Sequence, residues 1–575
     1  MMSDVPTSPR DADQSGVQPA EPSERTGISR RAMLRTGAVA AGVSTAGLVV
    51  SPAPGAPVPR SSAVFAHGVA SGDPLPHGVI LWTRVTPTTA ATPGSGRGPA
   101  VDVTWEVARD ATFARTVASG SIRTSVESDH TVKIDVSGLE PDTRYVYRFR
   151  VTSGPPVGAT SPTGHTRTAP AVDAEVERVR FGVVSCANWE AGYFGAYRHL
   201  RAHHDLSAIV HLGDYFYEYE TGGYGGKSGV VRRTKPANET VSLRDYRIRH
   251  AHYKTDADLA ELHRLLPWIC TWDDHESSND AWKGGAENHG PGEGPWAARK
   301  AASERAYYEW MPVRPEAAGT GRHIYRRLRF GRLLELSMLD LRTYRDQQVS
   351  ATSADVDDTR RSITGRAQMR WLTGGLTSST TRWQIVGNPV MIAPVLIPPL
   401  DARNTAAVTE VLGLPSGGVP YNADQWDGYT ADRRRLLDTI HDHGVDNVVF
   451  VTGDIHSSWA CDIPLDAARY PAGSVATELV VPSVTSSNID DILGVPEHTV
   501  GAAVPTAIMA ANRHVRWNDF DAHGYAVLTV TRAAAQMDWY FLVDKADPRT
   551  SRYHARSFRV RSGSPHVEAA TGPAD

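Results

Sequence analysis

Side chains able to bind metal ions follow four short apolar segments of the sequence. Residues 183–184, 209–212, 268–272 and 448–452 are expected as strands or strand ends. The segments after them are Ser185-Cys186-Ala187-Asn188, Gly213-Asp214-Tyr215-Phe216-Tyr217-Glu218, Asp273-Asp274-His275-Glu276 with Asn279 just beyond, and Gly453-Asp454-Ile455-His456. Ligands bind outside the carboxyl ends of strands in open α/β sheets, so we expect these loops to converge. Adjacent carboxylates without a cation repel each other and are costly to desolvate, and the set therefore predicts a polynuclear metal centre.

Two architectures are expected to position these loops. Residues from about 64 to 170 read as all-β, because 101–107, 131–136 and 144–150 alternate with period two. The turn before Tyr145 is similar to the one before a tyrosine-bearing strand in fibronectin-type sandwiches. From about residue 179, apolar strands alternate with helical stretches such as 296–310 and 430–443, which indicates an α/β domain with a sheet covered on both faces.

Composition excludes several classes of protein. The chain has 575 residues, of which 41% are hydrophobic and 22% charged, so wholesale disorder, a collagen and an all-coiled-coil rod are excluded. The net charge of −4 argues against a general electrostatic affinity for nucleic acid, and we predict no specific nucleic-acid partner. Cys186, Cys270 and Cys461 are too few for a disulfide framework; Cys270 and Cys461 are expected to be structural thiols, whereas Cys186 stands beside candidate ligands.

The N-terminus has the features of an export signal. Arg30-Arg31 precede a moderately apolar run at 36–50, a pattern typical of the twin-arginine route, which exports folded proteins. The run is too short and too rich in Gly and Ala for a strong membrane span, and the other interpretation is a buried core helix. We therefore expect a secreted or cell-envelope protein with the twin-arginine translocase as its partner during export and no stable transmembrane anchor.

These observations divide the chain into four parts. We expect a disordered leader with signal peptide at 1–60, a β-sandwich domain at 61–172, a catalytic domain at 173–562 and a disordered tail at 563–575. The basic runs 232–235 and 326–329 are expected on solvated faces, and the alternative is that either run meets an anionic substrate at the rim of the site.

The order of the ligand motifs resembles that of the calcineurin-like metallophosphoesterases. The forms that these motifs take in this sequence closely resemble those of the PhoD-type alkaline phosphatases. The resemblance covers nearly all of residues 60–560 and includes Asn388-Pro389-Val390-Met391 and Gln425-Trp426-Asp427-Gly428-Tyr429. The resemblance implies a four-layer α/β metallophosphoesterase domain preceded by a small fibronectin- or Ig-like β-sandwich. It also implies hydrolysis of phosphomonoesters and phosphodiesters, small or lipid, by attack of a metal-bound hydroxide.

The resemblance also implies a set of metal ligands. The family uses one ferric ion (Fe3+) and calcium (Ca2+), and its iron ligands correspond to Cys186, Asp214 and Tyr217. Calcium prefers several oxygens, which Asp214, Asp273, Asp274 and Asn279 can supply. Asp454 and His456 would complete the centre, with the metal that each binds left open, and Asp214 would bridge the metals. His275 is expected to protonate or stabilise the leaving oxygen rather than to bind a metal.

Other interpretations remain open. Tyr217 could simply pack, and His211 is expected to support the site through a hydrogen bond. A C-terminal element with His514, Trp517, Asp519 and His523 could cover the site. The alternative functions are a phospholipase D-like diesterase acting on lipids, an iron oxidase suggested only by thiolate–phenolate ligation, and a cell-surface binding protein with an inert catalytic domain. The intact ligand set argues against the last.

Overall fold

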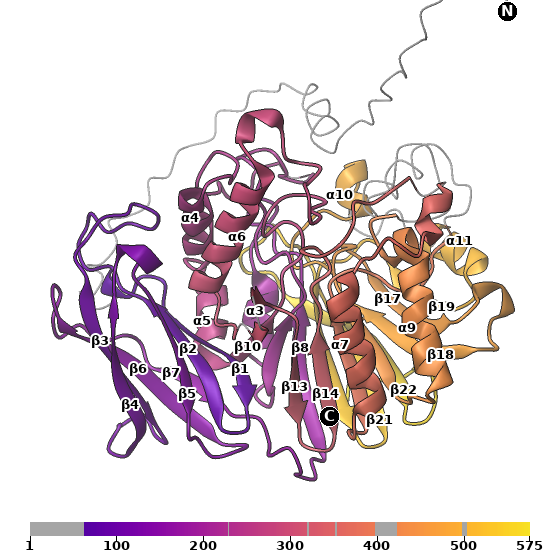
Figure 1. The fold of residues 1–575 in the computed structure, drawn as a ribbon, viewed down its shortest axis with the longest axis horizontal. Coiled ribbons are helices and arrows are strands. Elements are labelled where there is room, and N and C mark those ends of the chain that lie inside the picture. The colour runs from indigo at the N-terminus through magenta and orange to yellow at the C-terminus, as the bar shows by residue number, and fades with distance from the viewer. Residues whose placement is uncertain are drawn as a thin grey trace, which may run out of the picture.

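Two large β-sheets lie face to face in the computed structural model, which describes residues 63–227, 229–314, 316–318, 321–350, 353–396, 423–496 and 503–574 (Figure 1). The ten-stranded sheet has the order β23 (Val567–Ala569), β22 (Arg552–Arg561), β21 (Ala534–Leu542), β20 (Gly524–Thr531), β8 (Arg178–Val184), β9 (Ala208–His211), β10 (Pro267–Cys270), β1 (Val69–Leu75), β2 (Gly78–Arg84) and β5 (Thr131–Ser137). The seven-stranded sheet has the order β13 (Arg326–Phe330), β14 (Leu334–Met338), β15 (Trp383–Asn388), β16 (Val448–Thr452), β18 (Ser474–Val480), β17 (Ser458–Pro464) and β19 (Val515–Asp519).

Helices cover the outer faces of both sheets, so the domain has four layers (Figure 1). Beside the ten-stranded sheet lie α3 (Gly195–Leu200), α4 (Leu243–Tyr253), α5 (Ala257–Leu265) and α6 (Trp296–Trp310). Beside the seven-stranded sheet lie α7 (Gly365–Ser378), α9 (Thr430–Asp442), α10 (Ile489–Leu493) and α11 (Ala503–Ala511). The smaller elements are the hairpin β11 (Glu316–Ala318) and β12 (Gly321–His323), and the 3-10 helices η1 (Val126–Ser128), η2 (Pro291–Glu293), η3 (Ala354–Asp357), η4 (Trp426–Tyr429) and η5 (Ala467–Arg469).

The central core lies between the two sheets. Phe181 and Val210 of one sheet and Leu336 and Val449 of the other belong to one buried apolar cluster. Strands buried on both faces read as continuous apolar runs, and every residue of β16 is buried accordingly. The amphipathic pattern of α9 buries Leu436, Leu437 and Ile440 on the outer face of the second sheet. The predicted four-layer α/β fold class is therefore confirmed.

Parallel pairing brings the carboxyl ends of the central strands to one edge. Strands β8, β9 and β10 are parallel neighbours in the first sheet, and β14, β15, β16 and β18 are parallel neighbours in the second. A bridge between Ser185 and Ser483 joins the two sheets just beyond β8 and β18. The loops that carry the predicted ligands therefore leave the sheets on the same side of the molecule.

The N-terminal β layers share a sheet with the catalytic region. A four-stranded sheet of β4 (Thr116–Thr124), β3 (Val101–Ala108), β6 (Arg144–Ser153) and β7 (Gly164–Arg167) packs through a common apolar core against β1, β2 and β5 (Figure 1, left). Strand β1 pairs in parallel with β10, with Gly72 opposite Trp268. A Cβ on Gly72 would lie 2.1 Å from the carbonyl oxygen of Pro312, so this close approach requires glycine. The expected sandwich is present, but one of its layers continues into the catalytic sheet.

The C-terminal segment differs from the disordered tail that we expected at 563–575. Strand β23 pairs with β22, and the backbone N–H of Val567 donates to Asp462 Oδ1 at 2.7 Å. The side chain of Val567 is buried against the core between the sheets, and this burial orders the segment. The leader at 1–60 lies outside the described residues. Within the described ranges, no helix is long and apolar enough to cross a membrane.

A buried ion pair also joins the N-terminal strands to the second sheet. Arg326 of β13 donates to both carboxylate oxygens of Asp73 of β1, at 2.8 and 2.5 Å, and both side chains are buried. The expectation that Arg326 lies on a solvated face was therefore wrong. Sheet order, which places β1 beside β10 and close to β13, supplies a partner that the local sequence does not show.

Replacing Arg326 should destabilise the protein strongly. Arg326→Met leaves Asp73 as a buried charge without its guanidinium, which typically costs about 3–5 kcal/mol of unfolding free energy. The control is Arg123→Met, since Arg123 pairs with Asp102 at the surface, where their side chains are 64% and 36% exposed. Arg123→Met should lower the free energy of unfolding by no more than about 1 kcal/mol. Urea denaturation measures both, and equal changes would contradict the structural role of the buried pair.

Candidate metal centre

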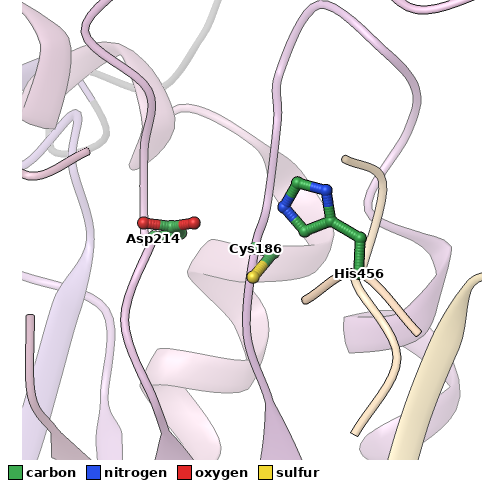
Figure 2. Close-up of side chains that lie close together, drawn as sticks. All are labelled: Cys186, Asp214 and His456. Atoms are coloured by element: carbon green, nitrogen blue, oxygen red, sulfur yellow. The ribbon is translucent and has the colours of Figure 1, made fainter. Parts of the chain in front are cut away.

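Three of the predicted ligands, from three separate loops, meet beyond the strand ends. Cys186 follows β8, Asp214 follows β9 and His456 follows β16, and their ligand atoms all lie within 4.8 Å of one another (Figure 2). All three residues have left-handed backbone, with φ of 59°, 56° and 49°, and Asp454 has 65°. Residues other than glycine rarely adopt this conformation, which costs about 1–3 kcal/mol each. The surrounding fold therefore holds strained backbone at this site.

Four carboxylates form a second group around the same point. The ligand oxygens of Asp214, Asp273, Asp274 and Asp454 also lie within 4.8 Å of one another, and Asp214, Asp274 and His275 form a third such group. Asp214 belongs to all three groups, as a residue bridging two cations would. Oδ1 of Asp214 and Oδ1 of Asp274 are buried without a hydrogen-bond partner. Such buried oxygens need a compensating partner, and a cation would provide one.

Burial changes the acidity of these groups. It raises the pKa of Asp214 and of Asp273 well above the ordinary value, and it raises the pKa of Asp454 to about 7. Burial, together with the neighbouring Asp214 and Asp454, likewise raises the pKa of the Cys186 thiol. All four groups bind metals in their deprotonated form, so a bound cation would offset the cost of their buried charge.

Tyr217 lies within this cluster rather than packing elsewhere. Its hydroxyl donates to Asp214 Oδ2 at 2.9 Å and lies 3.1 Å from His456 Nε2, and Ser486 Oγ donates to it at 2.6 Å. His456 Nδ1 is 2.8 Å from the carbonyl oxygen of Ser487. A carbonyl only accepts, so Nδ1 carries the proton and Nε2 is the nitrogen available as a ligand. Thiol, phenol, imidazole and carboxylate thus converge, a donor set that fits a highly charged transition-metal ion.

His275 is held beside the cluster by a buried carboxylate. Its Nδ1 lies 2.7 Å from Glu218 Oε2, while Glu218 Oε1 accepts from the backbone N–H of Asn279 at 2.8 Å and from Asn288 at 3.0 Å. Burial lowers the pKa of His275, but the charges of Asp274, Asp214 and Glu218 outweigh it and raise that pKa well above its ordinary value. Burial opposes ionisation of Glu218 as well, yet His275 and the other donors lower its pKa to about 2. Glu218 therefore orients the His275 ring beside the carboxylates.

Glu276 holds two ligand loops together. Its carboxylate accepts from the backbone N–H groups of Asp214 at 3.1 Å, Tyr215 at 2.6 Å and Asp273 at 2.8 Å. Burial raises the pKa of Glu276 to about 7, against the effect of these three donors. The residue fixes the backbone of the loops after β9 and β10.

The other residues that the sequence singled out have varied surroundings. The side-chain amide of Asn279 donates to Glu287 Oε2 at 3.2 Å. His211 Nδ1 accepts from the backbone N–H of Gly213 at 3.3 Å, in line with the expected support role, while Cys270 and Cys461 are buried.

Only part of the C-terminal element that was expected to cover the site lies beside the metal-ligand cluster. His523 Nε2 lies 2.9 Å from the carbonyl oxygen of Ser486, which contacts Tyr217. His514 instead binds the carbonyl of Pro394, and Trp517 packs on Trp539 with ring centroids 5.0 Å apart.

Sequence reasoning missed two charged residues of the site, Arg342 and Asp424. Arg342 follows β14 and is buried among the carboxylates, and it binds Asp424, which immediately precedes Gln425. A signal was present, because 333–341 is a fifth apolar segment that runs into charged residues. An arginine, however, does not belong to a metal-ligand pattern.

Comparisons with known proteins agree with this geometry. The family model described as "PhoD-like phosphatase" matches residues 181–539, and "PhoD-like phosphatase, N-terminal domain" matches residues 51–170. Alkaline phosphatase D of Bacillus subtilis (strain 168) is 35% identical over 499 residues, covering 85% of this chain and 79% of the relative. A solved structure of PhoD superposes with a TM-score of 0.78 at 32% identity, covering 91% of this chain and 94% of the other. The resemblance inferred from the motifs is confirmed.

Glu276→Gln should loosen metal binding without removing a ligand. The glutamine keeps one acceptor oxygen but presents an NH₂ group where a backbone N–H must be accepted, and loss of such supporting hydrogen bonds costs about 10–100-fold in metal affinity. Metal content after dialysis, measured by mass spectrometry, checks this expectation. Glu140→Gln is the control, since that side chain is 69% exposed and pairs with Arg109 at the surface. A Glu276→Gln protein that retains wild-type metal content would contradict the role given to this carboxylate.

Proposed function

Because this chain belongs to the PhoD-like phosphatase family and is a phosphoric ester hydrolase, we propose that it hydrolyses both phosphomonoesters and phosphodiesters with the help of iron and calcium. The observation that carries the proposal is the convergence of Cys186, Asp214, Tyr217 and His456 beside Asp274 and Asp454. A cell-surface binding protein with an inert catalytic domain would have no need of this strained, buried and highly charged arrangement.

The grouping of the donors supports an assignment of the two metal types. Cys186, Asp214 and Tyr217 would bind Fe3+, and His456, whose Nε2 is 3.1 Å from the Tyr217 hydroxyl, would join them. The oxygen-rich side of the cluster, with Asp214, Asp274 and Asp454, would bind Ca2+.

Asn279 and Asp273 are the remaining candidates on the calcium side. When bound, the cations would supply Lewis-acid polarisation of the phosphoryl group and activation of water near neutral pH.

His275 would protonate the leaving oxygen, and no serine beside the ligands would act as a nucleophile. Glu218 binds His275 at Nδ1, so Nε2 is the atom that can hold a proton for the leaving oxygen. The hydroxyls nearest to the ligands in sequence are engaged locally: Ser277 donates to the carbonyl of Asp274 and Ser457 to that of Ile455. Ser185 Oγ accepts from the Cys186 thiol at 3.3 Å. We therefore propose water as the nucleophile.

Export and substrate class complete the proposal. The paired arginines Arg30-Arg31 lie outside the described residues, and we propose that they direct export by the twin-arginine translocase to the cell envelope or exterior. A phospholipase D-like activity would need an apolar surface at the site. In the described part of the chain, the large exposed apolar side chains come from scattered segments, namely Val117, Val157, Val172, Val230, Leu396, Leu465, Val543 and Tyr553.

Asp214→Asn should abolish hydrolysis. Removing the charge shared by two cation sites weakens both, and metal polarisation contributes several kcal/mol, so less than about a tenth of the wild-type rate should remain. Rates on an aryl phosphomonoester and an aryl phosphodiester are to be measured together with iron and calcium content. Asp102→Asn, at a surface carboxylate, is the control and should behave as wild type. Full activity with full metal content in Asp214→Asn would refute the bridging role.

Iron bound by a tyrosinate should colour the protein. Charge transfer from Tyr217 should give the pure enzyme a visible absorption band, and Tyr217→Phe should bleach or shift it. Tyr224→Phe is the matched control, because its ring stacks on Tyr217 with centroids 5.4 Å apart and it should keep the band. EGTA should abolish activity while leaving the band in place, and added calcium should restore activity. A colourless, iron-free and fully active protein would refute the iron assignment.

A further inference from the structure

A single buried guanidinium lies at the centre of the carboxylate cluster. Arg342 donates to Asp424 Oδ1 at 2.9 Å and Oδ2 at 3.1 Å, and it lies 3.7 Å from Asp274 Oδ1 and 3.5 Å from Asp454 Oδ1. Its Nε and Nη2 also donate to Oδ1 and Oδ2 of Asp273, at 2.6 and 3.2 Å. The side chain of Arg342 is only 3% exposed, so these carboxylates are its surroundings.

The two adjacent aspartates after β10 are bound in different ways. Both oxygens of Asp273 are engaged by the planar fork of Arg342. Asp274 instead accepts the backbone N–H of Asp280 at Oδ2, at 2.6 Å, and its buried Oδ1 has no hydrogen-bond partner. The guanidinium occupies a lone pair on each oxygen of Asp273, and its positive charge disfavours a second cation beside them. Asp273 is therefore the poorer metal ligand of the two.

We propose that Arg342 is a positioning residue of the metal centre and that Asp273 anchors Arg342 instead of binding a metal. Asp274 and Asp454, together with Asp214, would then be the carboxylates that bind calcium. This inference rests on the proposed iron–calcium function and narrows its ligand set.

The contacts of Arg342 explain why an arginine is needed there. It comes from the loop after β14 and joins the loop after β10, the segment before η4 that holds Asp424, and the loop after β16 that holds Asp454. Arg345 binds the same Asp424 Oδ1 at 2.8 Å, and Gln425 donates to Asp454 Oδ2. Only a planar group with several donors can bind Asp273 and Asp424 in this way, whereas a lysine offers a point charge. These contacts hold the three loops together.

Calcium titration separates the two aspartates. Purified protein stripped with EGTA, its iron retained, is titrated with CaCl₂ in a calorimeter. Asp274→Asn should weaken calcium binding by more than about tenfold or lower its stoichiometry, because it loses a charged ligand. Asp273→Asn should keep the wild-type stoichiometry. Equal loss of calcium in the two variants would overturn the inference.

A double-mutant cycle tests the link between Asp273 and Arg342. If Asp273 acts only through Arg342, Asp273→Asn should add no further loss of calcium affinity to Arg342→Met. If the two losses multiply, Asp273 acts on the metal directly and the inference fails. Arg342→Lys should recover part of the affinity lost in Arg342→Met, since it restores the charge but not the fork.

Folding and the underlying function are controlled separately. Should Arg342→Met fail to give a wild-type near-UV circular dichroism spectrum, Arg342→Lys and Asp424→Asn replace it in the cycle. Asp424→Asn removes the other anchor of Arg342 and should weaken calcium binding without changing its stoichiometry; lost stoichiometry there would overturn the inference by making Asp424 a ligand. Absence of calcium binding by wild-type protein would overturn the proposed function itself.

Discussion

The cost of burying several negative charges close together constrains the whole site. Asp214, Asp273, Asp274 and Asp454 have oxygens within 4.8 Å of one another in a largely solvent-free part of the molecule. Without compensation such groups take up protons, and the raised pKa values of Asp214 and Asp273 express this tendency. Arg342 supplies a permanent positive charge within the cluster, and in our proposal iron and calcium match the remaining negative charge. The unfavourable energy of the buried carboxylates therefore favours the binding of cations.

Bringing these charges together requires support from the surrounding backbone. The loop after β9 passes so close to the loop after β10 that a Cβ on Gly213 would lie 2.5 Å from Cβ of Asp273. Gly213 also has a φ of 109°, which side chains disfavour, and Glu276 binds the backbone of both loops. The left-handed conformations of Cys186, Asp214 and His456 are tolerated because the packed sheets beneath them define where each loop starts and ends. Rigid strands and strained loops together preorganise the donors.

The same arrangement suits phosphoester hydrolysis. A phosphoryl group accumulates negative charge that a dense cluster of carboxylates alone would repel, so a site of this kind needs its cations to bind substrate at all. Glu218 orients His275 at the edge of the cluster, and in our proposal this histidine protonates the leaving oxygen. Family membership and the geometry of the site therefore lead to the same class of reaction by independent routes.

Much of this protein can be predicted from its sequence because the informative patterns are local. Strand periodicity and the polar segments that end the strands depend on neighbouring residues only, and they were sufficient for the fold class, the family and the convergence of the ligand loops. Tertiary structure alone decided the pairings across long sequence distances. Arg326 binds Asp73, 253 residues away, and Arg342 binds Asp273, 69 residues away, because sheet order makes them neighbours. The continuation of a sandwich layer into the catalytic sheet through β1 and β10 has the same origin. The sequence alone predicts that a charged side chain is exposed, because it does not show the distant residue with which that side chain pairs in the folded protein.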